Sequence, residues 1–210
     1  MIRVLLVDDH AMFREGLKQI LAKHADMSVG GEAGNGEEAI GKIRESDFDV
    51  ILLDISLPGQ GGLDVLNQIK AENPDQIVLI LSMHPEDQYA VRMLRAGASG
   101  YITKEGAADD LVSALRRVAS GGKYVSPNLA ERLASDLTEH GVKSPHQLLS
   151  NREFQVMSAL ALGKTLKEIA DALMLSEKTI TTYRGRILKK LGLRNNVELA
   201  HYAFQNKLLP

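Results

Sequence analysis

The alternation of short apolar runs with helical segments over the first 120 residues constrains the fold most strongly. The runs are rich in β-branched side chains, which is typical of strands buried on both faces of a parallel sheet. Alternation of this kind predicts right-handed βαβ units and an α/β, doubly wound, five-stranded parallel sheet covered by helices on both faces. The expected strands are 2–7, 28–33, 50–53, 77–81 and 100–103, and the expected helices are 13–22, 36–45, 63–72, 85–96 and 107–120.

The strand pattern stops after residue 122, and the rest of the chain has the periodicity of helices and turns. We therefore expect a first domain at 1–122, a linker at 123–148 and a second, all-α domain of four helices at 149–210. The linker is expected to contain a helix at 128–139. The four later helices are expected at 150–162, 165–173, 176–191 and 195–208.

Composition excludes several classes of protein. The chain has no cysteine, so disulfides, thiol nucleophiles and cysteine-based zinc sites are ruled out, and the six histidines show no H-E-x-x-H pair. Any metal must therefore use oxygen ligands. No run of about 18 apolar residues is present, and the N-terminus does not resemble a signal peptide. We expect a cytoplasmic protein with no membrane partner.

Charge is distributed unevenly along a chain of net charge −2. Residues 1–122 hold 12 Lys+Arg against 19 Asp+Glu, a charge of −7, and residues 123–210 hold 13 against 8, a charge of +5. An acidic half beside a basic half suggests a regulatory or metal-binding domain joined to one that meets a polyanion.

Reactive polar side chains follow four of the five expected strands. Asp8 and Asp9 follow the first strand, Asp54 the third, Ser82 the fourth and Lys104 the fifth. The carboxyl ends of parallel strands meet at one edge of a sheet, so these groups should converge there. Crowded carboxylates raise one another's pKa unless a cation joins them, which favours an oxygen-ligated divalent ion, most naturally Mg²⁺.

This arrangement suits phosphoryl transfer. Asp54 would be the nucleophile that forms an aspartyl phosphate, while the metal and Lys104 neutralise charge on the transferring oxygens. Ser82 would donate its hydroxyl to the phosphate. A single aspartate after a strand usually caps a turn, but five such residues at successive strand ends favour a functional site.

Four sequence strings resemble the receiver domain of bacterial response regulators. They are VDDH at 7–10, LLDISLPGQGG at 52–62, LSMH at 81–84 and GASGYITK at 97–104. The resemblance covers the whole N-terminal half and implies a flavodoxin-like sheet of strand order 2-1-3-4-5. It also implies that a sensor histidine kinase is the phosphoryl donor.

The same resemblance assigns roles to individual residues. Asp9 and Asp54 bind Mg²⁺ directly together with the backbone carbonyl of Ser56, while Asp8 acts mainly through water. Ser82 and Tyr101 form the switch pair, since the serine moves toward the phosphate and the tyrosine turns inward. The family often has proline after the lysine, where this chain has Glu105; the chemistry does not depend on that position.

The segment 176–191 has one apolar and one basic face. Ile180, Ile187 and Leu191 fall on one stripe, and the segment carries five Lys+Arg and one Glu. With the preceding helix it predicts a helix-turn-helix whose second helix enters the major groove of DNA. The expected DNA contacts are Lys178, Thr179, Thr181, Thr182, Arg184, Gly185, Arg186, Lys189 and Lys190.

The strings LSNRE at 149–153 and EIADALMLSEKTITTYRGRILKKLGL at 168–193 resemble the LuxR-type helix-turn-helix of NarL/FixJ-class regulators. The resemblance implies a transcription factor, not an enzyme, that catalyses only its own Mg²⁺-dependent phosphorylation and dephosphorylation. Its implied partners are double-stranded DNA, RNA polymerase indirectly, and a second copy of the chain, on phosphorylation or on DNA. The fourth helix would pair in that dimer, although some of its apolar residues must face the core of their own domain. The residues expected to furnish the apolar contacts are Val197, Leu199, Ala200, Ala203 and Phe204.

Two other classes of function remain open on sequence grounds. One is a Mg²⁺-dependent phosphatase with an aspartyl intermediate, which turnover of small phosphate esters would reveal. The other is an interaction module whose basic helices bind RNA or nothing, which a comparison of DNA and RNA in a mobility-shift titration would reveal.

Overall fold

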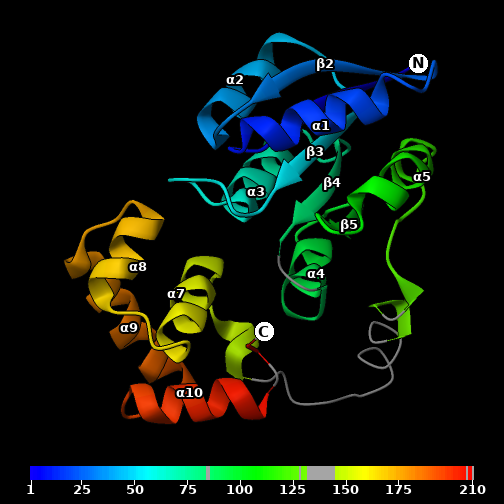
Figure 1. Ribbon diagram of the computed structural model, residues 1–210. Helices are drawn as coiled ribbons and strands as arrows, with labels where there is room; N and C mark the ends of the chain where they lie inside the picture. The colour runs from blue at the N-terminus through cyan, green and yellow to red at the C-terminus, as the bar shows by residue number, and fades with distance from the viewer. Residues whose placement is uncertain (84–85, 128, 132–144, 207, 210) are drawn as a thin grey trace. The chain divides into compact units, whose positions relative to one another are not determined.

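The computed structural model describes residues 1–83, 86–127, 129–131, 145–206 and 208–209 (Figure 1). The chain forms two compact units, Met1–Ser135 and Asp136–Pro210. Most of the helix expected at 128–139 lies outside the described residues, although Pro127 and residues 129–131 are helical. The expected domain boundaries at 122 and 148 stay predictions. No helix in the described ranges is long and apolar enough to cross a membrane.

The first unit contains a parallel sheet of five strands in the order β2-β1-β3-β4-β5, as expected. Each strand begins within one residue of its expected position. Two strands extend one residue further than expected, so that Asp54 and Ser82 are their last residues. The strands are β1 (Ile2–Val7), β2 (Met27–Ala33), β3 (Val50–Asp54), β4 (Ile77–Ser82) and β5 (Gly100–Thr103).

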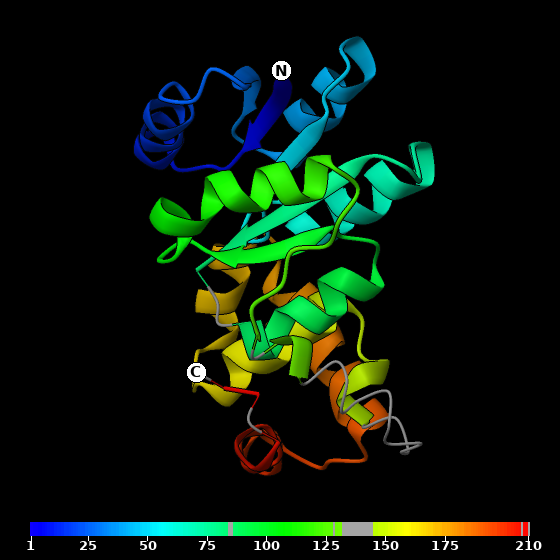
Figure 2. The same cartoon turned by 90° about the vertical axis from the view of Figure 1, so that its right-hand side faces the viewer.

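Helices cover both faces of this sheet because its side chains alternate between two apolar layers. Val4 and Leu6 belong to the core cluster that α1 (Ala11–Leu21) and α5 (Ala107–Ala119) complete. Figures 1 and 2 show α1 and α5 on one face and the other three helices on the opposite face. Those three are α2 (Gly36–Glu45), α3 (Gly62–Glu72) and α4 (Glu86–Arg95).

The residues after α5 return to the sheet and pair with its edge at β5. Tyr124 forms a parallel bridge with Gly100; its carbonyl accepts from Tyr101 N at 3.1 Å, and its N–H donates to Ser99 O at 3.0 Å. A Cβ on Gly100 would lie 2.6 Å from the Tyr124 carbonyl, so only glycine permits this approach. Ser126 donates to a Glu86 carboxylate at the start of α4. The start of the linker is thereby fastened to β5 and α4.

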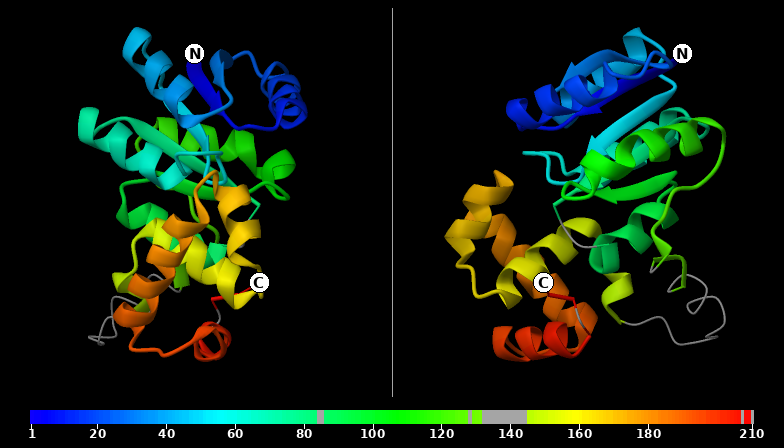
Figure 3. Two further views of the ribbon diagram at one scale, coloured as in Figure 1. Left: turned by 90° about the vertical axis from the view of Figure 1, so that its left-hand side faces the viewer. Right: turned by 45° about the vertical axis from the view of Figure 1, so that its right-hand side comes forward.

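The described residues of the second unit form no strand and contain the four expected α-helices (Figure 3). Two of them begin with the capping boxes that Ser150 forms with Glu153 and Thr165 with Glu168. Met174, in the turn before the third helix, has a φ of 52°. The elements are a 3-10 helix η1 (Pro145–Leu148), α7 (Asn151–Ala161), α8 (Leu166–Leu173), α9 (Glu177–Leu191) and α10 (Asn196–Gln205).

Candidate functional site

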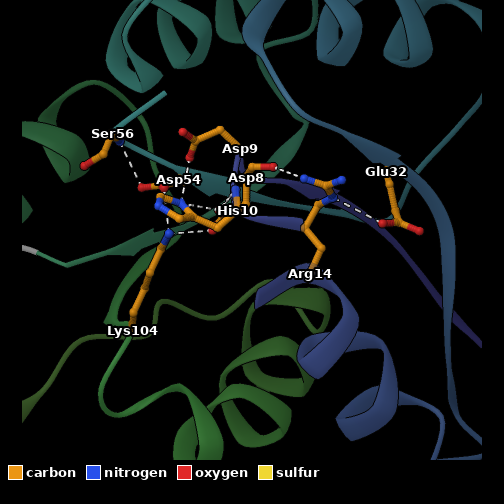
Figure 4. Close-up of polar contacts among 8 residues, drawn as sticks. All are labelled: Asp8, Asp9, His10, Arg14, Glu32, Asp54, Ser56 and Lys104. Carbon is orange, nitrogen blue, oxygen red and sulfur yellow. Dashed lines mark hydrogen bonds and ion pairs between the residues drawn. The ribbon is translucent and has the colours of Figure 1, made fainter. Parts of the chain in front are cut away.

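An acidic pocket lies at the carboxyl edge of the sheet, where β1, β3 and β5 end (Figure 4). The structure brings Asp8, Asp54 and Lys104 together there: Lys104 Nζ lies 2.6 Å from Asp8 Oδ2 and 2.7 Å from Asp54 Oδ2. All three side chains are buried. The single ammonium therefore compensates only part of the negative charge of two buried carboxylates.

The donor set of this pocket fits a divalent cation. Ligand atoms of Asp8, Asp9, His10 and Asp54 all lie within 4.8 Å of one another. Asp8 Oδ2 is buried and, apart from its ion pair with Lys104, accepts no hydrogen bond from any described residue. Carboxylate oxygens are the ligands that hard divalent cations prefer, so the pocket is compatible with such an ion.

Burial shapes the charge states in the pocket. It raises the pKa of Asp54 above its ordinary value, although the Lys104 ammonium and the Ser56 N–H, 2.9 Å from Asp54 Oδ1, oppose the rise. Burial alone would lower the pKa of Lys104, but contacts with Asp54 and Asp8 outweigh it and raise that pKa. Lys104 therefore stays cationic, and additional positive charge in the pocket would favour the ionised form of Asp54.

Ser82 and Tyr101 lie beside the pocket, and both side chains are fully buried. Burial raises the pKa of Tyr101, and a hydrogen bond with the Ser82 hydroxyl opposes that rise only in part. The role of Ser82 and Tyr101 as a switch pair stays a prediction. In this structure Tyr101 is buried and hydrogen-bonded with Ser82. Its backbone N–H binds the carbonyl of Tyr124, which connects this pair to the start of the linker.

The second unit presents one face of α9 to solvent. Ile180, Ile187 and Leu191 are buried, in agreement with their apolar stripe. The opposite face is exposed and carries the side chains of Lys178, Thr181, Thr182, Arg186 and Lys189 together with Gly185. A surface pocket on this face is lined by Lys178, Thr179, Thr182, Tyr183 and Arg186. Tyr183, which stands between Thr182 and Arg184, was not among the expected DNA contacts.

Comparison with protein families decides the identity of the chain. The response regulator receiver domain matches residues 4–116, and the luxR family of bacterial regulatory proteins matches residues 147–203. The chain belongs to the two-component response regulators. It joins a receiver domain to a LuxR-type DNA-binding domain, as in the NarL/FixJ class, and is a regulator of transcription.

Relatives of this response regulator match over the full length. The response regulator UvrY of Escherichia coli K12 is 39% identical over 209 residues, 99% of this chain and 96% of the relative. The response regulator GacA of Pseudomonas viridiflava is 40% identical over 210 residues, which cover 100% of this chain and 98% of the relative. A solved structure of RcsB from Salmonella enterica serovar Typhimurium shows RcsB bound to promoter rprA in the presence of phosphomimetic BeF3-. It matches this chain with a TM-score of 0.64 and 27% sequence identity, and the match covers 96% of this chain and 98% of RcsB.

Two residues of the regulator's pocket were not assigned a role from the sequence. The exposed side chain of His10 lies with its Nδ1 2.8 Å from Asp9 Oδ1. Arg14, on the first turns of α1, donates to the backbone carbonyl of Asp8 at 2.5 Å and pairs with Glu32 at 3.2 Å (Figure 4). Arg14 therefore holds the loop that carries the acidic pair, and its place one turn after His10 was the only signal in the sequence.

Two of the expected DNA contacts in the regulator are engaged within their own domain. Arg184 Nε donates to Asn196 Oδ1 at 2.7 Å, which joins α9 to α10. Lys190 Nζ lies 2.6 Å from Glu153 Oε2 and 3.3 Å from Leu148 O, which joins α9 to α7 and η1. Both side chains contribute to the packing of the helix-turn-helix.

The five apolar residues expected at a dimer contact divide between two faces of α10. Leu199 and Ala203 are fully buried in the domain. This agrees with the expectation that some of the five residues face the core of their own domain. Val197 and Phe204 are 80% and 77% exposed, and Ala200 is partly buried. Of these five residues, the ones that solvent reaches are therefore Val197, Ala200 and Phe204.

Proposed function

We propose that a sensor histidine kinase phosphorylates this response regulator on Asp54, and that the aspartyl phosphate controls sequence-specific binding of double-stranded DNA by α9. The observation that carries this proposal is the buried contact of Lys104 with both Asp54 and Asp8 at the carboxyl edge of the sheet. A carboxylate in such a pocket has a fixed position and a cation beside it, which suits in-line attack on a phosphoryl group.

The phosphoryl transfer breaks one bond and forms one bond. A carboxylate oxygen of Asp54 attacks the phosphorus, the phosphorus–nitrogen bond of the phosphohistidine breaks, and the nitrogen keeps the electron pair. Lys104 stabilises the negative charge on a phosphoryl oxygen, and the Ser56 N–H keeps Asp54 oriented. Asp8, Asp9, Asp54 and the Ser56 carbonyl would hold Mg²⁺, which supplies positive charge to the phosphoryl oxygens when bound.

Communication with the second domain begins at Ser82. We propose that its hydroxyl donates to the new phosphate instead of remaining with Tyr101, which alters the packing of β5 and α4. The linker is fastened to both of these elements through Tyr124 and Ser126, so a change there reaches the DNA-binding domain. The regulator would also dimerise, on phosphorylation or on DNA, through the exposed residues of α10. RNA polymerase would be an indirect partner of the regulator.

The test is the substitution Asp54→Asn, with Asp64→Asn at an exposed position of α3 as its control. Asp54→Asn should abolish labelling by radioactive acetyl phosphate in Mg²⁺ and abolish phosphate-stimulated DNA binding in a mobility-shift titration. Asp64→Asn should change neither. Labelling that survives in Asp54→Asn would place the nucleophile elsewhere, and turnover of small phosphate esters or tighter binding of RNA would favour a different class of protein.

A further inference from the structure

The centre of the exposed face of α9 carries only small side chains. Thr181 and Thr182 lie one turn before Gly185, and all three are exposed. We call these three residues the threonine–glycine strip. Lys178 precedes the strip on the same face and Lys189 follows it, so cationic side chains flank a centre with little side-chain volume.

The threonine hydroxyls of the strip are committed to their own helix. Thr181 Oγ1 donates to Glu177 O at 2.9 Å, and Thr182 Oγ1 donates to Lys178 O at 3.0 Å. Because each hydroxyl has one proton, neither side chain can donate a hydrogen bond to a base while these bonds are intact. Each exposed side chain therefore offers a ligand its methyl group and a hydroxyl oxygen that can accept but not donate a hydrogen bond.

Gly185 is not required by packing within the chain. A Cβ at this position would have no described atom within 4 Å, and φ is not in the left-handed region, since Gly185 is not among the positive-φ residues. Glycine in a helix interior is destabilising relative to alanine. Its absence of a side chain is therefore useful only to something that approaches α9 from outside.

The major groove of DNA offers one group that matches this surface. Among the four bases, thymine alone presents a methyl group there, and threonine methyl groups contact it favourably. We propose that the threonine–glycine strip recognises a thymine through its C5-methyl group, and that Gly185 allows the base edge to approach the helix backbone. This inference rests on the proposed DNA-binding function of α9. Lys178 and Lys189 then bind the phosphates on either side.

The experiment begins with duplexes that the full chain selects from a random-sequence DNA pool, in Mg²⁺ and beryllium fluoride. Each thymine of a selected duplex is replaced in turn by deoxyuridine, which differs only by the missing methyl group. Fluorescence anisotropy at fixed salt should show a loss of affinity of about fourfold at one or more positions, the value expected for burying one methyl group.

Matched protein variants locate the contact. Thr182→Val keeps a methyl group and should keep the preference for thymine over deoxyuridine, whereas Thr182→Ser keeps the hydroxyl and should reduce it. The same pair at Thr181 shows which threonine makes the contact. Gly185→Ala should raise the midpoint of thermal unfolding and weaken binding to the selected duplex, a combination that a purely structural role for Gly185 would not produce.

The possible outcomes separate this inference from the function on which it rests. Failure to select any duplex would overturn the proposed DNA binding and the inference together. The inference alone would be overturned if duplexes were selected but deoxyuridine had no effect on affinity. It would also be overturned if both serine variants kept the preference for thymine over deoxyuridine and both valine variants lost it. Undiminished binding by Gly185→Ala would remove the close approach of the base edge.

Discussion

The acidic pocket of the receiver and the exposed face of α9 both collect charged side chains, but they do so by different means. The pocket joins residues 50 positions apart in sequence, such as Asp54 and Lys104, and buries them against one another. The face of α9 presents exposed neighbours on a single helix. A polar group in the pocket therefore depends on its protein partners, whereas one on the helix face is solvated until a ligand replaces the water.

This difference predicts the largest effect for Lys104→Met. The substitution leaves Asp8 and Asp54 buried without their cation, and we expect a loss of about 3 kcal/mol in the free energy of unfolding of the receiver. Added Mg²⁺ should restore part of the loss because it supplies positive charge to the same carboxylates. Urea unfolding followed by circular dichroism measures both effects.

Lys178→Met on α9 is the control, because it removes the same charge from an exposed position. We expect it to change the free energy of unfolding by no more than about 0.5 kcal/mol. Similar losses in the two variants, or no response of Lys104→Met to Mg²⁺, would contradict the contrast between the buried pocket and the solvated face.

The second prediction compares two glycines in the same manner. A Cβ on Gly100 would lie 2.6 Å from Tyr124 O and 2.9 Å from Leu79 Cδ1, so Gly100→Ala should cost about 2 kcal/mol through overpacking. Gly185→Ala should instead stabilise its helix by up to about 1 kcal/mol. Thermal unfolding measures both, and hydrogen exchange should show faster exchange of the Tyr124 N–H in Gly100→Ala. Unchanged exchange there would mean that Tyr124 stays docked without the glycine.

The sequence predicted the pocket well because its geometry follows from topology. Once five buried runs alternate with helices, parallel strands are expected, and their carboxyl ends must share one edge. Asp8, Asp54 and Lys104 each stand at such an end, so their convergence required no knowledge of side-chain packing. The core stripe of α9 was equally accessible, because helical periodicity assigns Ile180 and Ile187 to one face.

Contacts between separate elements were not accessible in this way. The ion pair of Lys190 with Glu153 depends on how α9 crosses α7, and the bridge of Tyr124 to Gly100 depends on where the chain returns after α5. Periodicity also could not decide which of Val197 and Leu199 faces solvent, because the direction of the core is fixed only by the neighbouring helices. These features arise from tertiary packing, about which local sequence patterns carry little information.

The third prediction tests two adjacent lysines on α9. Lys190→Ala removes the partner of the buried Glu153 carboxylate and should lower the free energy of unfolding of the second domain by about 1 kcal/mol. Lys189→Ala should leave stability unchanged, weaken binding to all DNA sequences, and reduce the slope of log affinity against log salt by about one. Equal salt slopes in Lys189→Ala and the unsubstituted protein would mean that Lys189 makes no phosphate contact.

The smallest effect concerns pH and Glu153, a buried carboxylate of the second domain that is paired with a lysine as those of the pocket are. Burial alone would raise the pKa of Glu153, but Lys190 and the Ser150 N–H outweigh it and lower that pKa below its ordinary value of 4.5. The stabilisation is therefore present above about pH 4.5 and is lost as pH falls through the lowered pKa. Glu153→Gln keeps a side chain that can complete the capping box, yet it cannot ionise.

Glu153→Gln should therefore be less stable than the unsubstituted protein at pH 7, and the loss should be smaller than that caused by Lys190→Ala. The stabilities of Glu153→Gln and the unsubstituted protein should converge as the solution is acidified below pH 4.5. Glu168→Gln is the matched control, because Glu168 occupies the same capping position in α8 but is exposed. Water screens its charge, so its variant should show a weaker dependence on pH. Chemical denaturation at a series of pH values measures these differences. If the two glutamate variants respond equally to pH, burial beside Lys190 does not distinguish Glu153 from an exposed capping residue, and the second domain contains no counterpart of the receiver's paired charges.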